Sequence, residues 1–158
     1  MKKLLPLLVP ALLSALAVLP SFAPAQTTAV QGLTAIKSPY SAKETMDRFE
    51  AVVKEKNQVV FARVDHTAGG AKVNLAIRPT ELLVFGNPLG GTPLMQCAQT
   101  AGIDLPMKAL AWQDEGGQVW LGYNDATYLG QRHGVPQCPA LVNIGKALAG
   151  FAALATAK

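Results

Sequence analysis

The segment that most constrains the fold is a hairpin signal between residues 107 and 125, MKALAWQDEGGQVWLGYND. Two apolar and aromatic runs flank the turn sequence Asp114-Glu115-Gly116-Gly117, whose glycines can adopt the positive φ angles that tight hairpins need. Strands joined by so short a turn pair antiparallel. The segment therefore predicts a pair of antiparallel strands.

Three further stretches have the composition of strands, residues 29–38, 58–65 and 80–85. We expect the second of them to lie antiparallel or adjacent to the first. Four consecutive apolar residues, 82–85, indicate that the third strand is buried on both faces. The stretch 66–79 is ambiguous, because its centre could be a strand formed by Val73, Leu75 and Ile77 or a short helix that ends at Asn74, and periodicity cannot decide between them over so few residues.

The clearest helix signal follows the first of these strands. Ser41 and Glu44 form the S-x-x-E capping box that typically begins a helix. Asn57 is a residue that readily adopts the left-handed conformation at a helix end. One apolar stripe runs between these signals, formed by Ala42, Met46, Phe49 and Val53.

Further helices are expected near and after the hairpin. Thr92 as N-cap and Pro93 at the first helical position predict a helix that ends at Gly102. Two more helices are predicted over residues 126–134 and from Pro139 to the C-terminus. Strands in the middle of the chain with helices around them predict a single two-layer α+β domain, a mainly antiparallel sheet flanked by helices.

The first 25 residues have the pattern of a secretory signal peptide. Lys2 and Lys3 precede an apolar stretch, and Ala23 and Ala25 provide the small residues of an A-x-A cleavage site. Prolines interrupt the apolar stretch, and it is shorter than the roughly 20 residues that a membrane span needs. We therefore expect residues 26–158 to form the mature domain, periplasmic or secreted and not membrane-bound after cleavage.

Charge and cysteine content narrow the classes of partner. The net charge of +4 falls to +2 without the two leader lysines, and no run of like charge remains, which argues against nucleic acid as a partner. Cys97 and Cys138 are the two cysteines. Export to an oxidising compartment predicts that they form a disulfide. Both cysteines are expected to lie at or near helix N-termini. A reactive Cys138 thiolate beside a helix start is the alternative.

Residues 86–92, GNPLGGT, connect a predicted strand to a predicted helix. They match neither a Walker loop nor a dinucleotide-binding loop, because the lysine and the glycine spacing of those motifs are missing. A structural corner is the leading interpretation, although free N–H groups at a helix start could bind a ligand. The binding candidates that we name are Asn87, Gly90, Gly91, Thr92 and His66.

Candidate catalytic residues are sparse. His66 follows a strand and could exchange protons with Asp104 or Asp125, with Tyr123 nearby in the chain. Structural alternatives exist, since Asp104 precedes a Leu-Pro turn and Asp125 can cap the following helix. With two histidines in the chain and no ligand spacing of a known type, we predict no metal site and no cofactor.

Several blocks resemble the domain of unknown function 302 family. They are VDH at 64–66, RPTELL at 78–83, LLVFGNPLGGTPLM at 82–95, GIDLPMKALAWQDEGGQVWLGYND at 102–125 and RHG at 132–134. The resemblance extends from about residue 30 to 157. It implies a compact α+β domain, in several cases a homodimer, with a short helix at 67–74 and no established catalytic activity.

The leading functional hypothesis is an exported small binding or sensing module for an unknown small molecule. It would be a homodimer with a pocket near residues 86–92 and His66. One alternative is a small enzyme that uses His66 with a carboxylate, and another is a structural or interaction protein without catalysis.

Overall fold

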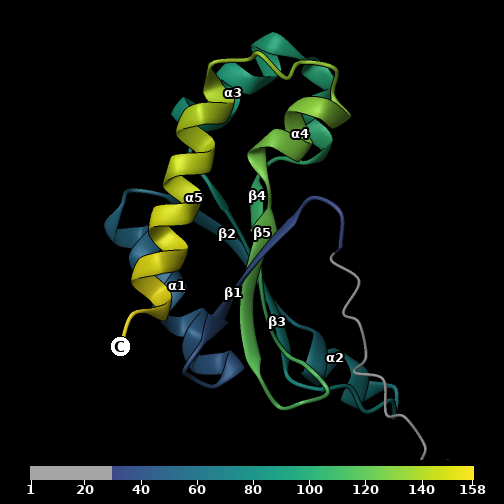
Figure 1. Ribbon diagram of the computed structural model, residues 1–158. Coiled ribbons are helices and arrows are strands. Elements are labelled where there is room, and N and C mark those ends of the chain that lie inside the picture. The colour runs from purple at the N-terminus through teal and green to yellow at the C-terminus, as the bar shows by residue number, and fades with distance from the viewer. Residues whose placement is uncertain (1–29) are drawn as a thin grey trace, which may run out of the picture.

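The computed structural model describes residues 30–158, so the predicted signal peptide lies outside the described residues (Figure 1). The elements in chain order are β1 (Leu33–Ser38), α1 (Ala42–Glu55), β2 (Val59–Asp65), α2 (His66–Lys72), β3 (Thr80–Gly86), α3 (Pro88–Cys97), the 3-10 helix η1 (Gln99–Ile103), β4 (Met107–Gln113), β5 (Val119–Asn124), α4 (Ala126–Arg132) and α5 (Ala140–Thr156). The strands form one antiparallel sheet in the order β1-β5-β4-β3-β2. The predicted α+β class and the β4–β5 hairpin are confirmed.

Two layers make up the molecule. Helices α1 and α5 pack against each other on one face of the sheet (Figure 1). Helices α3 and α4 lie at one end of the sheet, where β3 and β5 finish, and α2 and the β4–β5 turn lie at the other end. No helix within residues 30–158 has the length and apolar character needed to cross a membrane.

The core lies between the sheet and the two long helices. The apolar stripe predicted on α1 is buried, and its Phe49 ring packs edge-on against Phe85 of β3 at 5.2 Å between centroids. The centroid of the Phe151 ring of α5 lies 6.5 Å from that of the same Phe85 ring, again edge-on. Ser41 caps α1 as expected, because its Oγ accepts a hydrogen bond from the Glu44 N–H, and Asn57 has a φ of 57° beyond its end.

The expected neighbourhood of the first two strands is wrong. β1 and β2 are the two opposite edges of the sheet, because β1 pairs with β5 and β2 pairs with β3. Helix α1 carries the chain across the covered face between them. Consecutive strand signals cannot reveal this, since a helical connection can bridge any number of strand positions.

The apolar run in β3 is buried on one face instead of two. Leu83 and Phe85 point into the core and are 0% and 1% exposed, whereas Leu82 and Val84 on the other face are half-buried. The reason is that α1 and α5 both cover the same face. The opposite face of the sheet is referred to below as the open face.

The ambiguous stretch after β2 is helical, as the family resemblance implies. Helix α2 spans His66–Lys72 and is capped by Asp65, whose Oδ1 accepts a hydrogen bond from the Ala68 N–H at 2.8 Å. Asn74, with a φ of 58°, turns the chain back toward β3. The strand alternative for Val73 to Ile77 is wrong, since these residues lie outside any strand and are exposed.

Candidate functional site

A cavity of about 760 Å³ lies at the end of the sheet where β3 finishes. Its walls come from α3, α5, the β3–α3 junction and the residues between η1 and β4. The wall residues are Gln58, Phe61, Phe85, Gly86, Asn87, Pro88, Leu89, Gly90, Gly91, Thr92, Pro93, Met95, Gly102, Leu105, Pro106, Met107, Pro139, Ala140, Asn143, Ile144, Ala147, Leu148 and Phe151. This volume falls within the range of small-molecule pockets.

Helix α3, which forms one wall, begins earlier than its sequence predicts. Asn87 is the N-cap, because its Oδ1 accepts a hydrogen bond from the Leu89 N–H at 2.8 Å, and Pro88 is the first helical residue. The predicted cap Thr92 and the predicted first residue Pro93 both lie inside the helix. The helix also ends at Cys97, before the predicted Gly102, and η1 follows it.

Two glycines of this segment lie beyond the corner between β3 and α3. Gly90 and Gly91 are helical, and the corner itself is formed at Asn87, whose Nδ2 also donates to the Asn57 carbonyl at 3.1 Å. A Cβ at Gly91 would lie 3.4 Å from the Leu105 side chain, whereas one at Gly90 would meet nothing within 4 Å. Gly91 therefore lies close to Leu105, whereas Gly90 faces open space.

A β-bulge brings an aromatic side chain to the same cavity. The β2–β3 register shifts between Val60 and Ala62, so Phe61 is an extra residue without a partner in β3. Bulges redirect side chains at sheet edges. Phe61 lines the cavity and is 55% exposed, which makes it available to a bound molecule.

The cavity has an apolar lining with polar groups that are all uncharged. Its polar side chains are those of Gln58, Asn87, Thr92 and Asn143, and no Asp, Glu, Lys, Arg or His is among the wall residues. An ionised ligand would lose its hydration here without gaining a counter-charge, which is unfavourable. The chemistry of the walls therefore suits an uncharged, mainly apolar molecule.

Four of the five predicted binding residues come together in this cavity, and the fifth does not. Asn87, Gly90, Gly91 and Thr92 are wall residues, whereas His66 is not. In the antiparallel β2–β3 pair, Val59 lies opposite Gly86 and Asp65 lies opposite Glu81. His66 is therefore at the far end of these strands from the cavity, so the single pocket expected from residues 86–92 and His66 does not form.

The predicted catalytic residues are dispersed. His66 is exposed, and no hydrogen bond joins it to Asp104, Tyr123 or Asp125 among the described residues. Asp125 caps α4, as its structural alternative predicts, by accepting from the Tyr128 N–H at 3.0 Å. Tyr123 is buried, and burial, together with the nearby charge of Asp125, raises the pKa of its phenol.

Asp104 contacts the other histidine. His133 Nε2 lies 2.7 Å from Asp104 Oδ2, and the second ring nitrogen of His133 lies 3.1 Å from the Thr100 hydroxyl. Arg132 adds a contact to the same carboxylate oxygen at 3.2 Å. The His133 and Asp104 side chains are 6% and 11% exposed, so this cluster joins the end of α4 to η1 inside the protein.

Sequence reasoning missed this cluster because its members are 29 and 33 residues apart in the chain. Their local contexts, a turn before Leu-Pro and a helix end, do not indicate a common location. Within residues 30–158, no group of three or more His, Cys, Asp or Glu side chains has an arrangement that could hold a metal ion.

The predicted disulfide between Cys97 and Cys138 is confirmed, with a Cα–Cα distance of 6.1 Å. Cys97 is the last residue of α3 and precedes Ala98, the N-cap of η1. Cys138 precedes Pro139, the N-cap of α5. The bond therefore connects two walls of the cavity at their ends.

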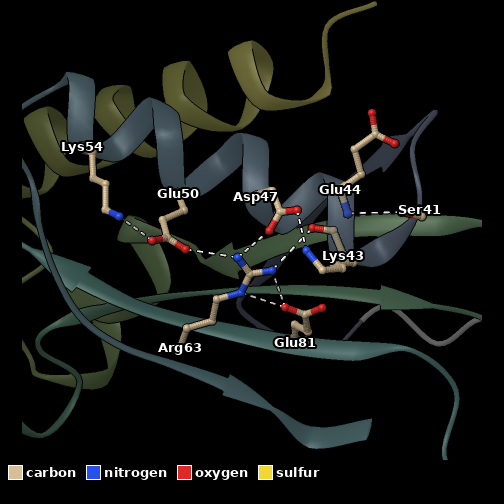
Figure 2. A network of polar contacts seen from close by, with 8 residues as sticks. All are labelled: Ser41, Lys43, Glu44, Asp47, Glu50, Lys54, Arg63 and Glu81. Atoms are coloured by element: carbon tan, nitrogen blue, oxygen red, sulfur yellow. Dashed lines mark hydrogen bonds and ion pairs between the residues drawn. The ribbon is translucent and has the colours of Figure 1, made fainter. Parts of the chain in front are cut away.

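The most concentrated group of charges lies away from the cavity, between α1 and the sheet (Figure 2). Arg63 of β2 binds Asp47 and Glu50 of α1 at 2.6 and 3.1 Å, and its Nε donates to Glu81 of β3 at 2.8 Å. Burial alone would lower the pKa of Arg63, but the hydrogen bonds that its guanidinium donates to the three carboxylates outweigh burial and raise that pKa.

The same contacts shift the carboxylates of this group. The pKa of Asp47 is lowered by hydrogen bonds from Lys43 and Arg63, and the pKa of Glu50 is lowered by hydrogen bonds from Lys54 and Arg63. Because each charged side chain of the group has a partner of opposite sign, the group satisfies itself. Its arrangement suits holding α1 on the sheet better than binding a ligand.

Comparisons with known proteins place these observations in context. The model of a family described as "Domain of unknown function DUF302" matches residues 34–151. A crystal structure of an uncharacterized conserved DUF302 protein from Bacillus stearothermophilus has the same fold, with a TM-score of 0.69 and 21% identity, covering 77% of this chain and 96% of that one.

Curated relatives with a different kind of name are also similar. Proteins named fluoride-specific ion channel FluC 1, from Brucella suis biovar 1 and Brucella abortus biovar 1, are 50% identical to this chain over 102 residues. The match covers 65% of this chain and 40% and 38% of those proteins. The chain thus spans about two fifths of the length of the curated relatives that it matches.

Proposed function

The chain belongs to the DUF302 family, and we propose that it is an exported binding module whose cavity between α3 and α5 holds an uncharged, largely hydrocarbon small molecule. The observation that carries this proposal is the combination of volume and lining, about 760 Å³ lined mainly by apolar residues and by no charged residue. Cavities of this size and character are the usual location of ligand sites.

The binding free energy would come mainly from the hydrophobic effect. Each CH₂ group transferred from water into such a cavity contributes about 0.8 kcal/mol before the entropy of association is subtracted. The amides of Asn87 and Asn143 and the hydroxyl of Thr92 can orient a hydroxyl or carbonyl group on the ligand. A hydrocarbon molecule with one or two neutral polar groups fits this distribution best.

The proposal is tested by binding of N-phenyl-1-naphthylamine, an uncharged apolar fluorophore that brightens when it leaves water. We expect saturable binding to the wild-type protein. Ala147→Phe places a ring in the cavity from α5 and should weaken that binding by about tenfold or more. Ala149→Phe adds the same ring on the exposed side of α5, outside the cavity, and should leave the affinity unchanged.

Native mass spectrometry of the protein purified from cells identifies the natural ligand. We expect a mass above that of the polypeptide, lost on denaturation and absent from Ala147→Phe. Equal fluorophore binding by Ala147→Phe and Ala149→Phe, with both variants folded, would remove the cavity from the proposal.

Export is part of the same proposal. The leader pattern of residues 1–25 and the Cys97–Cys138 disulfide are both typical of proteins that function outside the cytoplasm. We therefore place the mature form, residues 26–158, in the periplasm or secreted. The intact mass of the exported protein should correspond to a chain that begins at Gln26, and a membrane-retained chain of full mass would contradict it.

We further propose that the mature protein is a homodimer formed through the open face of the sheet. That face presents the Trp112 and Trp120 rings stacked at 6.5 Å, flanked by apolar residues from β1, β2, β3 and β4, namely Leu33, Ala35, Ala62, Val64, Leu82, Val84 and Leu110. Five strands of this length give roughly 500 Å² of plan area. This area is at the lower limit of what stable dimers bury on each side.

The channel name of the Brucella relatives suggests a second setting for the domain. A fluoride ion is strongly hydrated, and the cavity offers no charged side chain to replace that water. We propose that ion conduction in those relatives belongs to the part of their chains outside the match. Titrating fluoride with this protein should leave the ¹⁹F resonance of the ion unbroadened. Saturable broadening would contradict the proposed apolar ligand and identify fluoride as the ligand.

A further inference from the structure

Few interactions of helix α3 itself hold it in place beside the cavity. Its ten residues include Gly90, Gly91 and the internal Pro93, types with poor propensity for a helix interior, and Leu94 is its one buried residue. A ten-residue segment of that composition is marginal as a helix unless other parts of the protein restrain it. Together with η1 it forms a cap, residues 88–103, that covers one side of the cavity.

The disulfide is the covalent restraint at the far end of α3. β3 leads directly into the start of α3. Cys97, the last residue of α3, is bonded to Cys138, which lies shortly before α5. Both bonded elements are cavity walls, since α3 contributes Pro88 to Met95 and α5 contributes Ala140 to Phe151. The width of the cavity between them therefore depends on this bond.

We propose that reduction of the Cys97–Cys138 disulfide opens the cavity, so that the redox state of this bond controls entry and release of the apolar ligand. This inference rests on the proposed function and adds its regulation. The oxidised protein retains its ligand behind a restrained α3. The reduced protein exchanges its ligand rapidly because α3 moves away from α5.

The chemistry requires a dithiol as the reductant. A thiolate of the dithiol attacks the sulfur of Cys97, whose residue is exposed, and displaces the Cys138 sulfur as a thiolate. The second thiol of the reagent then attacks the reagent sulfur that is bonded to Cys97 and displaces the Cys97 sulfur as a thiolate. Two electrons and two protons pass to the cysteines, which become thiols, and the dithiol becomes a cyclic disulfide.

The opening is local because the rest of the cap has other attachments. η1 stays bound to α4 through the Asp104–His133 and Asp104–Arg132 contacts and through the fully buried Ala101. Helix α5 is anchored in the core along its length by Leu141, Ile144, Leu148, Ala152 and Ala155, whereas α3 contributes Leu94 alone to that core. Reduction therefore frees α3 first.

The test measures release of N-phenyl-1-naphthylamine from the oxidised and the dithiol-treated wild-type protein by stopped-flow fluorescence. We expect the release rate to rise by about tenfold or more on reduction. The double variant Cys97→Ser/Cys138→Ser should release the fluorophore at the fast rate with or without dithiol. Equal release rates for oxidised and reduced protein, with two free thiols titrated and the fold retained, would overturn the inference.

Hydrogen exchange makes the inference independent of the fluorophore and of the variant. On reduction of the wild-type protein, faster exchange should be confined to residues 88–97. Unchanged exchange in residues 88–97 would overturn the inference, whether or not the protein binds an apolar molecule. Failure to bind any apolar molecule would instead refute the proposed function. Faster exchange throughout residues 30–158 would also overturn it, because the bond would then stabilise the whole domain instead of α3.

Discussion

The two histidines of this chain have the same side chain and opposite surroundings. His66 begins α2 at the surface, whereas His133 is almost buried and contacts Asp104 and Thr100 with its two ring nitrogens. Removing a buried hydrogen-bonded group leaves its partners without compensation, but removing an exposed one does not. The structural importance of the two residues is therefore expected to differ.

We expect His133→Ala to lower the free energy of unfolding by about 1.5–3 kcal/mol, the range for hydrogen bonds to a charged group. His66→Ala should change it by less than about 0.5 kcal/mol. It should also leave fluorophore binding unchanged, because His66 is not a cavity residue. Urea denaturation of both variants measures the difference, and loss of ligand in His66→Ala would restore the binding role predicted from sequence.

At the scale of the element, the identity of the N-cap residue of α3 can be tested directly. Asn87→Ala removes the side-chain acceptor of the Leu89 N–H and should cost about 1 kcal/mol. Thr92→Ala, at the cap position predicted from sequence, should cost much less because Thr92 lies within the helix and is exposed. Thermal unfolding compares the two variants, and the reverse order would restore Thr92 as the cap.

Arg63 connects α1 to two strands, so its removal tests how the elements are joined (Figure 2). Arg63→Met leaves Asp47, Glu50 and Glu81 without their shared cation and should lower the free energy of unfolding at pH 7 by about 1–2 kcal/mol. Lys54→Met is the control, since this exposed i,i+4 pair with Glu50 is expected to contribute only about 0.3–0.5 kcal/mol.

The pH dependence of the Arg63 variant has a definite sign. The pKa values of Asp47 and Glu50 are lowered in the folded protein, so these groups stabilise it above their unfolded pKa of about 4. That stabilisation is lost as the pH falls through their folded pKa values. The difference between wild type and Arg63→Met should therefore shrink below about pH 4, and a difference that grows there would contradict the assigned role.

At the scale of the whole molecule, the open face of the sheet decides the expected assembly. Light scattering of the mature protein at micromolar concentration should give about twice the mass of one chain. Ala35→Glu places a charge on the exposed part of that face and should produce a monomer. Ala149→Glu, on the exposed side of α5, should remain dimeric, and a monomeric wild-type protein would exclude the dimer.

Features that depend on a few adjacent residues could be predicted from the sequence. The Ser41 cap, the buried stripe of α1 and the β4–β5 hairpin all follow from local hydrogen bonds or from periodicity, and all three are confirmed. The pairing of Cys97 with Cys138 was predictable because the chain has no other cysteine. The α+β class follows from the same signals, since strands and helices must bury their apolar faces against each other.

The tertiary structure alone decided what depends on distant segments. It placed β1 and β2 at opposite edges, separated His66 from the cavity, and brought Asp104 to His133. Strand order and helix position are set by the packing of the whole core, in which each contact joins residues far apart in the chain. The cavity itself arises in this way, because its walls meet only after α3 and α5 have closed over the end of the sheet.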